Sequence, residues 1–422
     1  MLTVEDLKDL KGKKVLVRVD FNVPHKGSEI TDDNRVTAAI PTIKKLAEQG
    51  ARVVLMSHLG KVKWKDIKKG KATLEDIQKQ MKKNDLSIVM PVLGAKLPGV
   101  KVSFCPATRG AELKNAIDSL GDGDVLLVQN TRYEAGEEAN DPELAKEWAS
   151  YVDAFVMDAF GSAHRAHAST YGVPHVLNGE GKPTAVGYLM EKEIKGLGRC
   201  VSPKEDERPY IAILGGSKVS TKIEVIDSLL KKCDKILIGG GMSYTFKAAI
   251  FGINVQNSIC EPDQFDYVKK CYETGKIMLS VDTVVGKGFN PDDPYAKVED
   301  SKVVEGNEDF PEGYEGLDIG PKTRELYAAE IAKAKTVFWN GPMGAFENPD
   351  FQAGTKAVCE AVAEATGKGA FTVIGGGDSA AAAKQFGYAD KFSHISTGGG
   401  ASLELIQYDG HLPGIDVIAE GK

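Results

Sequence analysis

Four short apolar segments in the second half of the chain run into glycine residues. They are Tyr210–Leu214 before Gly215, Lys235–Ile238 before Gly239, Phe371–Ile374 before Gly375, and Phe392–Ile395, which reaches Gly398 after two hydroxyl residues. Apolar runs of four or five residues with β-branched members predict buried strands. Glycine after a strand lets backbone N–H groups approach a ligand directly, and ligands of parallel sheets bind where the strands end. The pattern therefore predicts a large, phosphate-bearing ligand held by backbone groups.

Strand-like segments in the first half end instead in polar and basic residues. These segments are Lys14–Val19, Arg52–Met56, Val125–Val128 and Ala154–Met157. If they form a parallel sheet, the side chains that converge on its edge are Arg35, His58, Arg132, Arg165 and His167. Converging arginines suit a small polyanion, because the guanidinium fork matches carboxylate and phosphate geometry. The two halves of the chain are thus predicted to carry two different anion sites.

Length and charge limit what surrounds these sites. A chain of 422 residues is too long for one ordinary hydrophobic core, so two or three domains are expected. The net charge of −7 gives no global argument for binding nucleic acid or membranes, and neither is expected as a partner. Each anion site must then be a local basic cleft on an acidic body.

The cysteines and the N-terminus indicate the compartment. None of the six cysteines belongs to a Cys-x-x-Cys pair, and most lie in or beside apolar stretches, which favours reduced structural thiols. The first residues lack a basic region followed by an apolar one, and no apolar stretch is long enough to span a bilayer. A cytoplasmic location is expected.

The elements that position the sites alternate along the chain. Amphipathic segments separate the strand-like runs at Thr37–Gln49, Pro142–Tyr151, Lys222–Lys232 and Thr323–Ala334. This alternation predicts an α/β architecture with mainly parallel sheets. A further segment with helical spacing, Thr184–Leu197, lies where the basic-ended half gives way to the glycine-ended half, and we interpret it as an interdomain helix followed by an exposed connector over residues 201–208.

A lysine-rich segment over residues 61–84 interrupts this pattern. Its latter part places Leu74, Ile77 and Met81 at helical spacing. A solvated amphipathic helix on a long loop is the favoured interpretation.

The nucleotide motifs discriminate between ligand classes. The chain contains no Gly-x-x-x-x-Gly-Lys-Ser/Thr, which argues against a P-loop NTPase. Gly375-x-Gly377-x-x-Ala380 matches a loose dinucleotide fingerprint, but the next strand ends without the acid that this fingerprint expects. The acid lies in the turn, at Asp378. Beside phosphates it would be a ligand for Mg²⁺, and the alternative is a simple helix cap.

Lys218 and Lys222 follow another strand-to-glycine turn. Four residues apart, they would share one face of a helix, in the first turn where the helix dipole disfavours cations. A lysine pair placed against helix stability indicates function, although two solvated lysines are the alternative. Glu347, after Trp339-Asn-Gly-Pro, could bind nucleotide hydroxyls or cap a helix.

Taken in order, these motifs resemble those of the phosphoglycerate kinase family over almost the whole chain. The matching stretches are Arg18-Val-Asp-Phe-Asn-Val-Pro24, Asn34-Arg35, Ser57-His-Leu-Gly60, Asn130-Thr-Arg-Tyr133, Asp158-Ala-Phe-Gly-Ser-Ala-His-Arg-Ala-His167, Leu214-Gly-Gly-Ser-Lys-Val219, Gly316-Leu-Asp-Ile-Gly-Pro321, Trp339-Asn-Gly-Pro342, Gly375-Gly-Gly-Asp378 and Ser396-Thr-Gly-Gly-Gly-Ala-Ser-Leu-Glu404. The resemblance implies two Rossmann-like lobes, at residues 1–180 and 201–404, joined by an interdomain helix or hinge at 181–200. It also implies a C-terminal tail, 405–422, that packs back on the first lobe.

The resemblance implies a substrate for each lobe. The first would hold 3-phosphoglycerate or 1,3-bisphosphoglycerate through Asp20, Phe21, Asn22, Arg35, His58, Leu59, Gly60, Lys61, Arg132, Arg165 and His167. The second would hold Mg-ADP or Mg-ATP through Gly216, Lys218, Lys222, Gly316, Gly320, Glu347, Gly376, Gly377, Asp378 and Ser379, with Asp378 on the metal. The groups implied in catalysis are Arg35, Lys218, Lys222, Gly377 and Gly400.

Four departures from the family pattern stand out. Lys61 replaces an arginine of the family's His-Leu-Gly-Arg-Pro, and lysine cannot form the bidentate fork. The lysine-rich stretch after it looks like an insertion. Gln129 stands where the family usually has glutamate, and Ser379 replaces a common threonine while retaining the hydroxyl.

The implied reaction needs no nucleophilic side chain. An acyl phosphate donates its phosphoryl group to ADP, and in reverse a carboxylate, ionised at neutral pH, attacks ATP. His58, His164 and His167 are therefore interpreted as hydrogen-bond donors. The reaction requires in-line placement, neutralised charge and exclusion of water, so the lobes must close, with Thr184–Leu197 as the candidate hinge.

Two other classes of function remain open at this stage. A Rossmann-type NAD(P) dehydrogenase would explain the α/β pattern, but the missing ribose-binding acid counts against it. A non-catalytic phosphoglycerate or nucleotide sensor is the other, and the presence of Arg35, Lys218, Lys222 and Asp378 argues against it. A monomer is expected from the family resemblance only.

Overall fold

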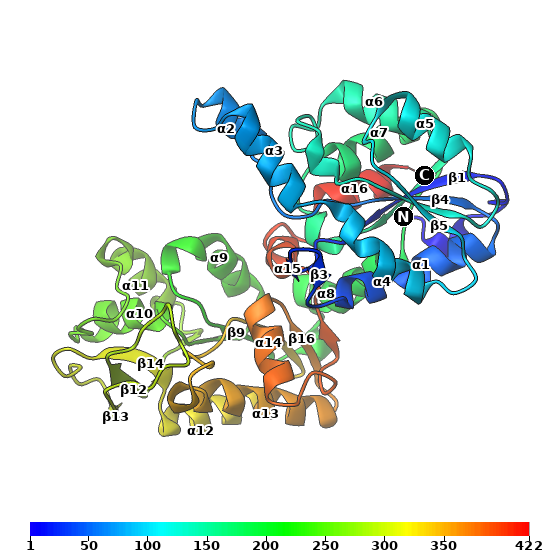
Figure 1. The fold of residues 1–422 in the computed structure, drawn as a ribbon. Helices are drawn as coiled ribbons and strands as arrows, with labels where there is room; N and C mark the ends of the chain where they lie inside the picture. Colours follow the sequence, from blue (N-terminus) through cyan, green and yellow to red (C-terminus); the bar gives the residue numbers. More distant parts are fainter. Residues whose placement is uncertain (422) are drawn as a thin grey trace. The chain divides into compact units, whose positions relative to one another are not determined.

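The computed structural model describes residues 1–421, which divide into two compact units (Figure 1). Unit 1 comprises Met1–Ile194 together with the C-terminal residues from His411 on, and unit 2 comprises Lys195–Gly410. Each unit has a sheet of six strands in which every neighbouring pair is parallel. The predicted α/β class with mainly parallel sheets is confirmed.

The sheet of unit 1 has the strand order β5-β6-β4-β1-β7-β8. Its strands are β1 (Lys14–Val19), β4 (Arg52–Met56), β5 (Val102–Cys105), β6 (Val125–Val128), β7 (Ala154–Asp158) and β8 (Thr184–Val186). Three of the four predicted strands have the predicted bounds, and the fourth extends by one residue to Asp158. The short hairpin β2 (His25–Lys26) and β3 (Glu29–Ile30) lies outside this sheet.

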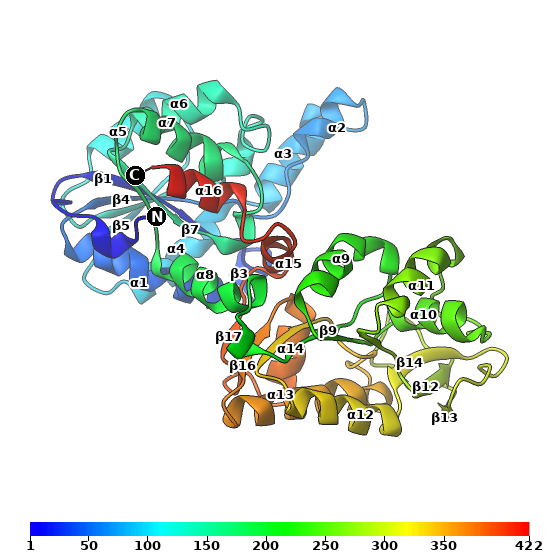
Figure 2. The same ribbon diagram turned by 180° about the vertical axis from the view of Figure 1, so that it is seen from behind.

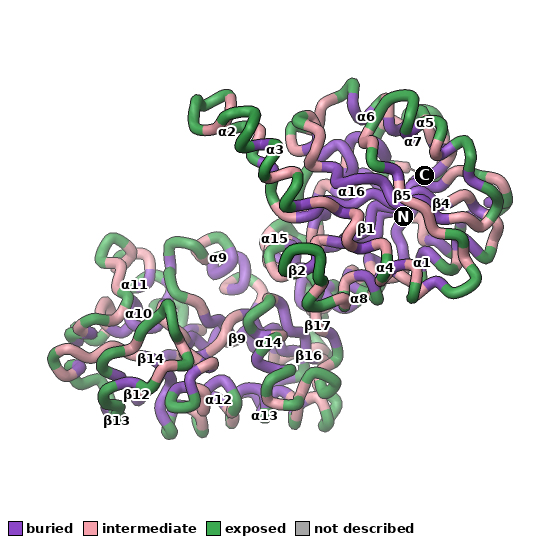
Figure 3. The backbone as a smooth tube through the Cα atoms, in the orientation of Figure 1, coloured by how far each residue is buried: buried purple, intermediate pink, exposed green. Residues whose placement is uncertain are grey.

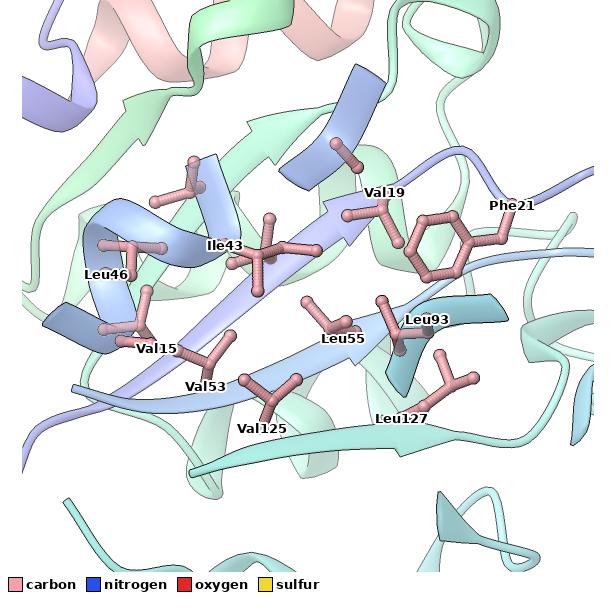
Figure 4. Close-up of a cluster of buried hydrophobic side chains, with 14 of the residues drawn as sticks. Val15, Val19, Phe21, Ile43, Leu46, Val53, Leu55, Leu93, Val125 and Leu127 are labelled. Carbon is pink, nitrogen blue, oxygen red and sulfur yellow. The ribbon is translucent and has the colours of Figure 1, made fainter. Parts of the chain in front are cut away.

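Helices cover the sheet of unit 1 on both faces. They are α1 (Asn34–Glu48), α4 (Met90–Lys96), α5 (Gly110–Asp118), α6 (Pro142–Ser150), α7 (Val173–Gly179) and α16 (Pro413–Glu420). Figure 4 shows one half of the core, where Val15, Val53 and Val125 of adjacent strands lie below Ile43 and Leu46 of α1. The helical spacing of the buried side chains of α1 gives this helix one apolar face. The sheet and its helix thus form a packed base for the loops after β1 and β4.

The lysine-rich segment forms α2 (Trp64–Lys68) and α3 (Leu74–Lys83), a mostly exposed pair of helices (Figure 3). Thr73 and Asp76 form a capping box that begins α3, and Ile77 is its one buried residue. The predicted helical character of the latter part is confirmed, whereas α2 was not predicted.

The sheet of unit 2 has the order β11-β10-β9-β15-β16-β17. Its strands are β9 (Tyr210–Leu214), β10 (Lys235–Ile238), β11 (Ile277–Met278), β15 (Thr336–Asn340), β16 (Phe371–Ile374) and β17 (His394–Ile395). A second sheet, with antiparallel strands β12 (Asp282–Lys287), β13 (Asp300–Glu305) and β14 (Glu315–Ile319), was not predicted. Strand β13 is polar and almost wholly exposed, so it lacks the apolar signal of a core strand.

The helices of unit 2 flank its parallel sheet and carry the glycine turns. They are α9 (Ile223–Lys232), α10 (Met242–Phe251), α11 (Phe265–Glu273), α12 (Pro321–Ala332), α13 (Ala353–Gly367), α14 (Gly377–Gln385) and α15 (Gly399–Gln407). Residues of α12 and α13, among them Tyr327, Ile331 and Val362, form one core with Ile213 and Trp339 of the sheet. Among the described residues, no helix is long and apolar enough to cross a membrane.

The predicted helix at 181–200 begins later than expected. Thr184–Val186 is strand β8, which pairs with β7, and α8 runs from Tyr188 to Val201. The β-pairing of this short apolar run overrides its helical spacing. The boundary between the two units falls inside α8, after Ile194.

The C-terminal tail also differs from its predicted start at residue 405. Residues up to Gly410 belong to unit 2, where Leu405 and Ile406 are buried and the Ile406 carbonyl accepts a hydrogen bond from Ser228 Oγ at 3.1 Å. Helix α16 packs beside α7 in unit 1 (Figure 2), and the Val417 carbonyl accepts from Asn178 Nδ2 at 2.7 Å. The tail that returns to unit 1 is therefore the shorter one that follows Gly410.

Asp158, at the end of β7, caps α8 and supplies a test of this fold. Its Oδ1 accepts hydrogen bonds from the backbone N–H groups of Leu189 and Met190, at 3.1 and 3.3 Å. Complete burial raises the pKa of this carboxyl from 3.8 to about 7. Folded unit 1 therefore favours the protonated acid, so the contribution of Asp158 to stability is greatest below pH 3.8 and is lost as the pH rises to about 7.

Asp158→Asn keeps the capping oxygen but cannot ionise. The free energy of unfolding of the variant should therefore increase relative to that of the wild type as the pH rises from 4 to 8. The measurement is urea unfolding followed by the fluorescence of Trp148, which is buried in unit 1, in a background where Trp64 and Trp339 are phenylalanine. A difference between variant and wild type that does not change with pH would contradict the prediction.

Candidate functional site

In each parallel sheet the strand order reverses at a central strand, so that the strands added before and after it lie on its two sides. In unit 1, β4 and β7 lie on opposite sides of β1, and in unit 2, β10 and β15 lie on opposite sides of β9. At such a point the loops that follow two adjacent strands lead to opposite faces of the sheet. This leaves a crevice at the carboxyl ends of those strands, where ligands bind. The predicted basic and glycine-rich loops follow these strands.

Arg35 is held at the edge of the unit 1 sheet by the loop after β1. Its Nη1 donates to Asp20 Oδ1 at 3.1 Å and to the Asn22 carbonyl at 2.9 Å. Asn22 in turn accepts from the backbone N–H of Gly60 at 2.8 Å through its side-chain oxygen. These bonds join the loops after β1 and β4 and leave the guanidinium partly exposed, with 37% of the Arg35 side chain accessible.

Asn130 connects the loop after β6 to the same place. Its amide donates to the carbonyls of Leu59 and Asn84 at 2.7 and 2.9 Å, and its oxygen accepts from the N–H of Arg132 at 3.0 Å. Arg132 Nη1 donates to the Gly60 carbonyl at 2.6 Å, while its buried Nε makes no hydrogen bond among the described residues and lies 3.8 Å from Glu138 Oε1. A buried guanidinium N–H without a hydrogen bond is costly unless a ligand accepts one from it.

The histidines of this site are neutral. Burial, and then the positive charge of Arg18 and Arg132, lowers the pKa of His58 well below its usual value. Burial likewise lowers the pKa of His167 to about 4 and that of His164 below its usual value. Neutral imidazoles beside arginines supply N–H donors without adding charge. His58 Nδ1 accepts from Arg18 Nη2 at 2.9 Å and His164 Nε2 accepts from Arg165 Nε at 3.2 Å, so each ring keeps one nitrogen as a donor, and donation to a ligand stays a prediction.

Four predicted residues of unit 1 are placed at the margins of this cluster. Phe21 and Leu59 are fully buried in the core, so their side chains support the loops and cannot reach a ligand. Arg165 is exposed, and its Nε donates to His164 Nε2 at 3.2 Å. Lys61 is exposed, next to the lysine-rich helices.

Unit 2 has a cavity of about 490 Å³ at the carboxyl end of its sheet. Its lining includes three residues predicted from the sequence, namely Gly216, Gly316 and Asp378. Residues that line it and were not predicted include Gly240, Gly241, Tyr244, Leu317, Pro342 and Gly344. The cavity is large enough for a small organic ligand.

Close backbone contacts explain two of the glycines at this edge. A Cβ on Gly215 would lie 2.0 Å from the Pro342 carbonyl oxygen, and one on Gly399 would lie 2.8 Å from Gly376 Cα. The turns after β9 and β15, and those that begin α14 and α15, can meet only without side chains. By contrast, no atom lies within 4 Å of a Cβ built on Gly377 or Gly400, so these two predicted residues face open space.

Lys222 and Asp378 lie close together beside these turns. Lys222 Nζ donates to Asn340 Oδ1 at 2.8 Å; burial lowers its pKa, and the nearby Asp378 opposes that shift. The Ser379 hydroxyl accepts from the Gly341 N–H at 2.7 Å, which fixes the start of α14. A cation and a carboxylate therefore lie near each other at the start of α14, and the carboxylate lines the cavity.

Lys218 does not share a helical face with Lys222, which corrects the sequence prediction. A 3₁₀ turn, Val219–Thr221, separates them, and Lys218 has extended backbone angles (φ −130°, ψ 132°). α9 begins only at Ile223. Lys218 is exposed, so its amine can reach outward while that of Lys222 stays against Asn340.

Asp378 is not the cap of α14. The N-cap residue is Gly376, and no side-chain capping bond forms there. Asp378 is exposed on the cavity wall. Within residues 1–421 there is no group of three or more His, Cys, Asp or Glu side chains placed to hold a metal, so a metal here would need ligands from another molecule.

Gly320 and Glu347 are absent from the cavity wall as the structure places them. A Cβ on Gly320 would lie 2.2 Å from the carboxyl of Asp282, which accepts from the N–H groups of Lys322 and Thr323 at the start of α12. Gly320 thus makes room for a helix cap. Glu347 is partly exposed outside the lining.

Two buried charged residues that lie behind the unit 1 site were not predicted as site residues. Arg18 and Glu137 are almost fully buried and lie behind His58 and His167. An arginine inside an otherwise apolar strand was the available signal for Arg18, because arginine is rarely buried unpaired. Glu137, in a polar loop, gave no signal.

Comparisons with known proteins agree with this arrangement. The sequence model of the family described as phosphoglycerate kinase matches residues 4–409. The chain is similar to phosphoglycerate kinase of Enterococcus faecalis (51% identity, 98% of each chain covered) and of Thermosipho africanus (48% identity, 100% of this chain and 98% of the relative).

Solved structures give the same result. The chain is similar to a structure of phosphoglycerate kinase from Coxiella burnetii, with a TM-score of 0.81 and 35% identity over 99% of this chain and 98% of that one. It is also similar to one from Pyrococcus horikoshii OT3, with a TM-score of 0.76 and 30% identity over 100% and 99% of the two chains.

Gly316→Ala tests the predicted adenosine end of the cavity. A Cβ there would lie 2.2 Å from the ring of Tyr244, which would be pushed into the cavity. Adenine nucleotide affinity, measured by calorimetry, should fall about tenfold, a loss of roughly 1.4 kcal/mol of binding free energy, because the displaced ring would occupy part of the cavity. Gly367→Ala in α13, where no atom lies within 4 Å of the added Cβ, is the control. Unchanged affinity in a folded Gly316→Ala variant would contradict this assignment.

Proposed function

The chain belongs to the phosphoglycerate kinase family, and we propose that the loop cluster of unit 1 binds the phosphoglycerate and the cavity of unit 2 binds the nucleotide. The enzyme transfers the acyl phosphate of 1,3-bisphosphoglycerate to ADP, giving 3-phosphoglycerate and ATP, a reversible step of glycolysis and gluconeogenesis. The assignment of residues to each substrate is the proposal.

The observation that carries the assignment is the segregation of binding groups. Arginine and histidine side chains gather in unit 1, where Arg35 is partly exposed and the buried Nε of Arg132 makes no hydrogen bond among the described residues. Such groups suit a small anion with carboxylate and phosphate oxygens. In unit 2, the glycine turns after β9 and β10 and Asp378, in the first turn of α14, line the cavity, as suits a chain of phosphates held by backbone N–H groups.

The transfer proceeds without a general base. The carboxylate of 3-phosphoglycerate is already ionised at neutral pH. The substrate therefore has no proton that a histidine of unit 1 would need to accept. Arg35, Lys218 and Lys222 are proposed to neutralise the oxygens of the moving phosphoryl group, and the N–H groups of Gly377 and Gly400 to orient them. Catalysis then rests on in-line placement and electrostatic stabilisation.

Mg²⁺ is proposed to bind through Asp378. Asp378 is an exposed carboxylate on the cavity wall, which fits this ion, because Mg²⁺ is held through one or two carboxylates plus substrate phosphates and keeps several waters. When bound, the ion neutralises charge on the nucleotide phosphates. Lys222, near Asp378, adds a fixed positive charge from the protein.

Closure of the two units is proposed to accompany catalysis. An acyl phosphate is hydrolysed by water, so the reacting groups must be shielded. The boundary between the units falls inside α8, which makes this helix the candidate hinge. We further propose that the enzyme is a cytoplasmic monomer.

The direct test is an assay of ATP consumption with 3-phosphoglycerate as acceptor, coupled to reduction of the acyl phosphate. The purified chain should consume ATP only when both 3-phosphoglycerate and Mg²⁺ are present. A chain that binds both ligands without turnover would instead be a sensor.

Arg35→Ala should lower kcat by on the order of 10² or more, with a smaller effect on nucleotide affinity, because it removes a donor to the transition state. Arg52→Ala is a matched control: Arg52 is a similarly exposed arginine of unit 1 with its own carboxylate partner, Asp122. Near-native turnover of Arg35→Ala would remove this residue from the mechanism.

Asp378→Asn should raise the KM for the Mg-nucleotide and weaken the dependence of the rate on Mg²⁺ concentration, because the amide is a poor ligand for this ion. Asp390→Asn, an exposed aspartate of the same unit, controls for charge. An unchanged magnesium titration would show that Asp378 does not bind the metal.

A further inference from the structure

Arg18 is an arginine buried in the sheet of unit 1 directly behind the proposed phosphoglycerate site. It lies near the end of β1, with a relative exposure of 1%. Its guanidinium donates in three directions: Nε to Ser169 Oγ at 2.8 Å, Nη1 to the Val19 carbonyl, and Nη2 to Nδ1 of His58 at 2.9 Å. Each of the three guanidinium nitrogens thus donates to the protein, and the buried Arg18 has no exposed face for a substrate.

A buried carboxylate compensates the charge of Arg18. Glu137 is fully buried and attracts Arg18 electrostatically. Its two oxygens accept from the N–H and the hydroxyl of Ser169 at 2.8 and 2.7 Å, so Ser169 bridges the two charges. Buried ion pairs of this kind are costly and contribute to specific geometry more often than to stability.

This network determines where His58 carries its proton. A guanidinium can only donate hydrogen bonds, so Nδ1 of His58 must be the acceptor. The single proton of the neutral imidazole therefore lies on Nε2, at the opposite corner of the ring. No protein partner for Nε2 is seen among the described residues.

We propose that Arg18 is a positioning residue that, braced by Ser169 and Glu137, holds His58 in the Nε2–H tautomer so that this N–H is available to an anionic group of the phosphoglycerate. This rests on the proposed function of the site. His58 would then be the group that touches the substrate, and Arg18 would act only through it.

The charges around His58 support a single, neutral donor state. Burial, together with the positive charge of Arg18, Arg132 and Arg35, keeps the pKa of His58 well below its usual range. The acids nearest this cluster, Asp20, Glu137 and Glu138, act on Arg18, Arg132 and His167. Across the neutral pH range the imidazole gains no second proton, so its tautomer decides whether it can donate to the substrate.

Three variants separate this role from a merely structural one. Arg18→Met removes the donor but leaves Glu137 buried and unpaired. Arg18→Met with Glu137→Gln removes both charges and is the variant best able to fold. Arg18→Lys keeps a charge and a donor but cannot reach Ser169, Val19 and His58 together. Arg52→Met, at the other end of the sheet, is the control.

The first readout is the ring-nitrogen spectrum of the full chain labelled with ¹⁵N-histidine, without substrate. The chain has seven histidines, and His58→Gln identifies the His58 signals. The wild type should show His58 only as the Nε2–H tautomer at pH 8, and the Arg18 variants should show a mixture. A wild-type Nδ1–H tautomer, or a folded double variant that keeps the single Nε2–H tautomer, would overturn the proposal.

The second readout is kinetic. Because only the Nε2–H tautomer can donate to the substrate, the KM for 3-phosphoglycerate at pH 8 should rise as the inverse of the fraction of His58 left in that tautomer, roughly twofold for an equal mixture, with the KM for ATP unchanged and Arg18→Lys intermediate. For Arg18→Met the pKa of His58 rises, because a positive neighbour is gone while Glu137 remains. At pH 6 more of the imidazole then carries both protons, and the defect relative to wild type should shrink.

The two readouts distinguish failure of this inference from failure of the proposed function. A tautomer mixture with an unchanged KM for 3-phosphoglycerate would overturn the proposed donor role of His58. If the wild type holds the Nε2–H tautomer but does not phosphorylate 3-phosphoglycerate, the proposed function fails, while the control of His58 by Arg18 is supported by the spectra alone.

Discussion

Parallel pairing of the central strands is the constraint on which both candidate sites depend. Because every strand of a parallel sheet ends at the same edge, loops far apart in the sequence are brought together there. In unit 1 this edge gathers Asn22, Gly60 and Arg132 from the loops after β1, β4 and β6. In unit 2 it gathers the glycine turns after β9, β15 and β16. One architecture thus produces two anion sites of different chemistry.

The chemistry differs because each edge is supported differently. The turns of unit 2 approach one another so closely that side chains are excluded, as Gly215 and Gly399 show, which leaves the backbone as the binding surface. The loops of unit 1 are held by side chains such as Asn130, whose amide bonds span three segments. A buried pair, Arg18 and Glu137, lies behind them. Unit 1 therefore presents oriented side chains. His58 is neutral among the arginines because burial and the repulsion of its charged form by their positive charges lower its pKa.

Sequence patterns predicted the parts of this structure that depend on local residues. The apolar runs of β1, β4, β6, β9, β10 and β16 gave those strands with their observed bounds, since a buried strand has a continuous apolar signal. They did not predict β8 or the polar strand β13, whose pairing depends on neighbours distant in sequence. The predicted loops bring together five of the predicted site residues: Asp20, Asn22, Arg35, His58 and Arg132. Glu137 and Ser169 could not have been predicted, because only the folded chain brings them to Arg18. Phe21 and Leu59 show the converse, since they belong to a predicted motif but their side chains are buried in the core.

Division of the two substrates between the units is the central claim, and hydrogen–deuterium exchange of the whole chain tests it most directly. With 3-phosphoglycerate alone, backbone amides of residues 20–22, 57–61 and 131–133 should exchange more slowly, while those of unit 2 are unaffected. With Mg-ADP alone, protection should appear at 215–217, 240–242, 316–317 and 376–379, and not in the unit 1 loops. Protection of the same unit by both ligands would contradict the account.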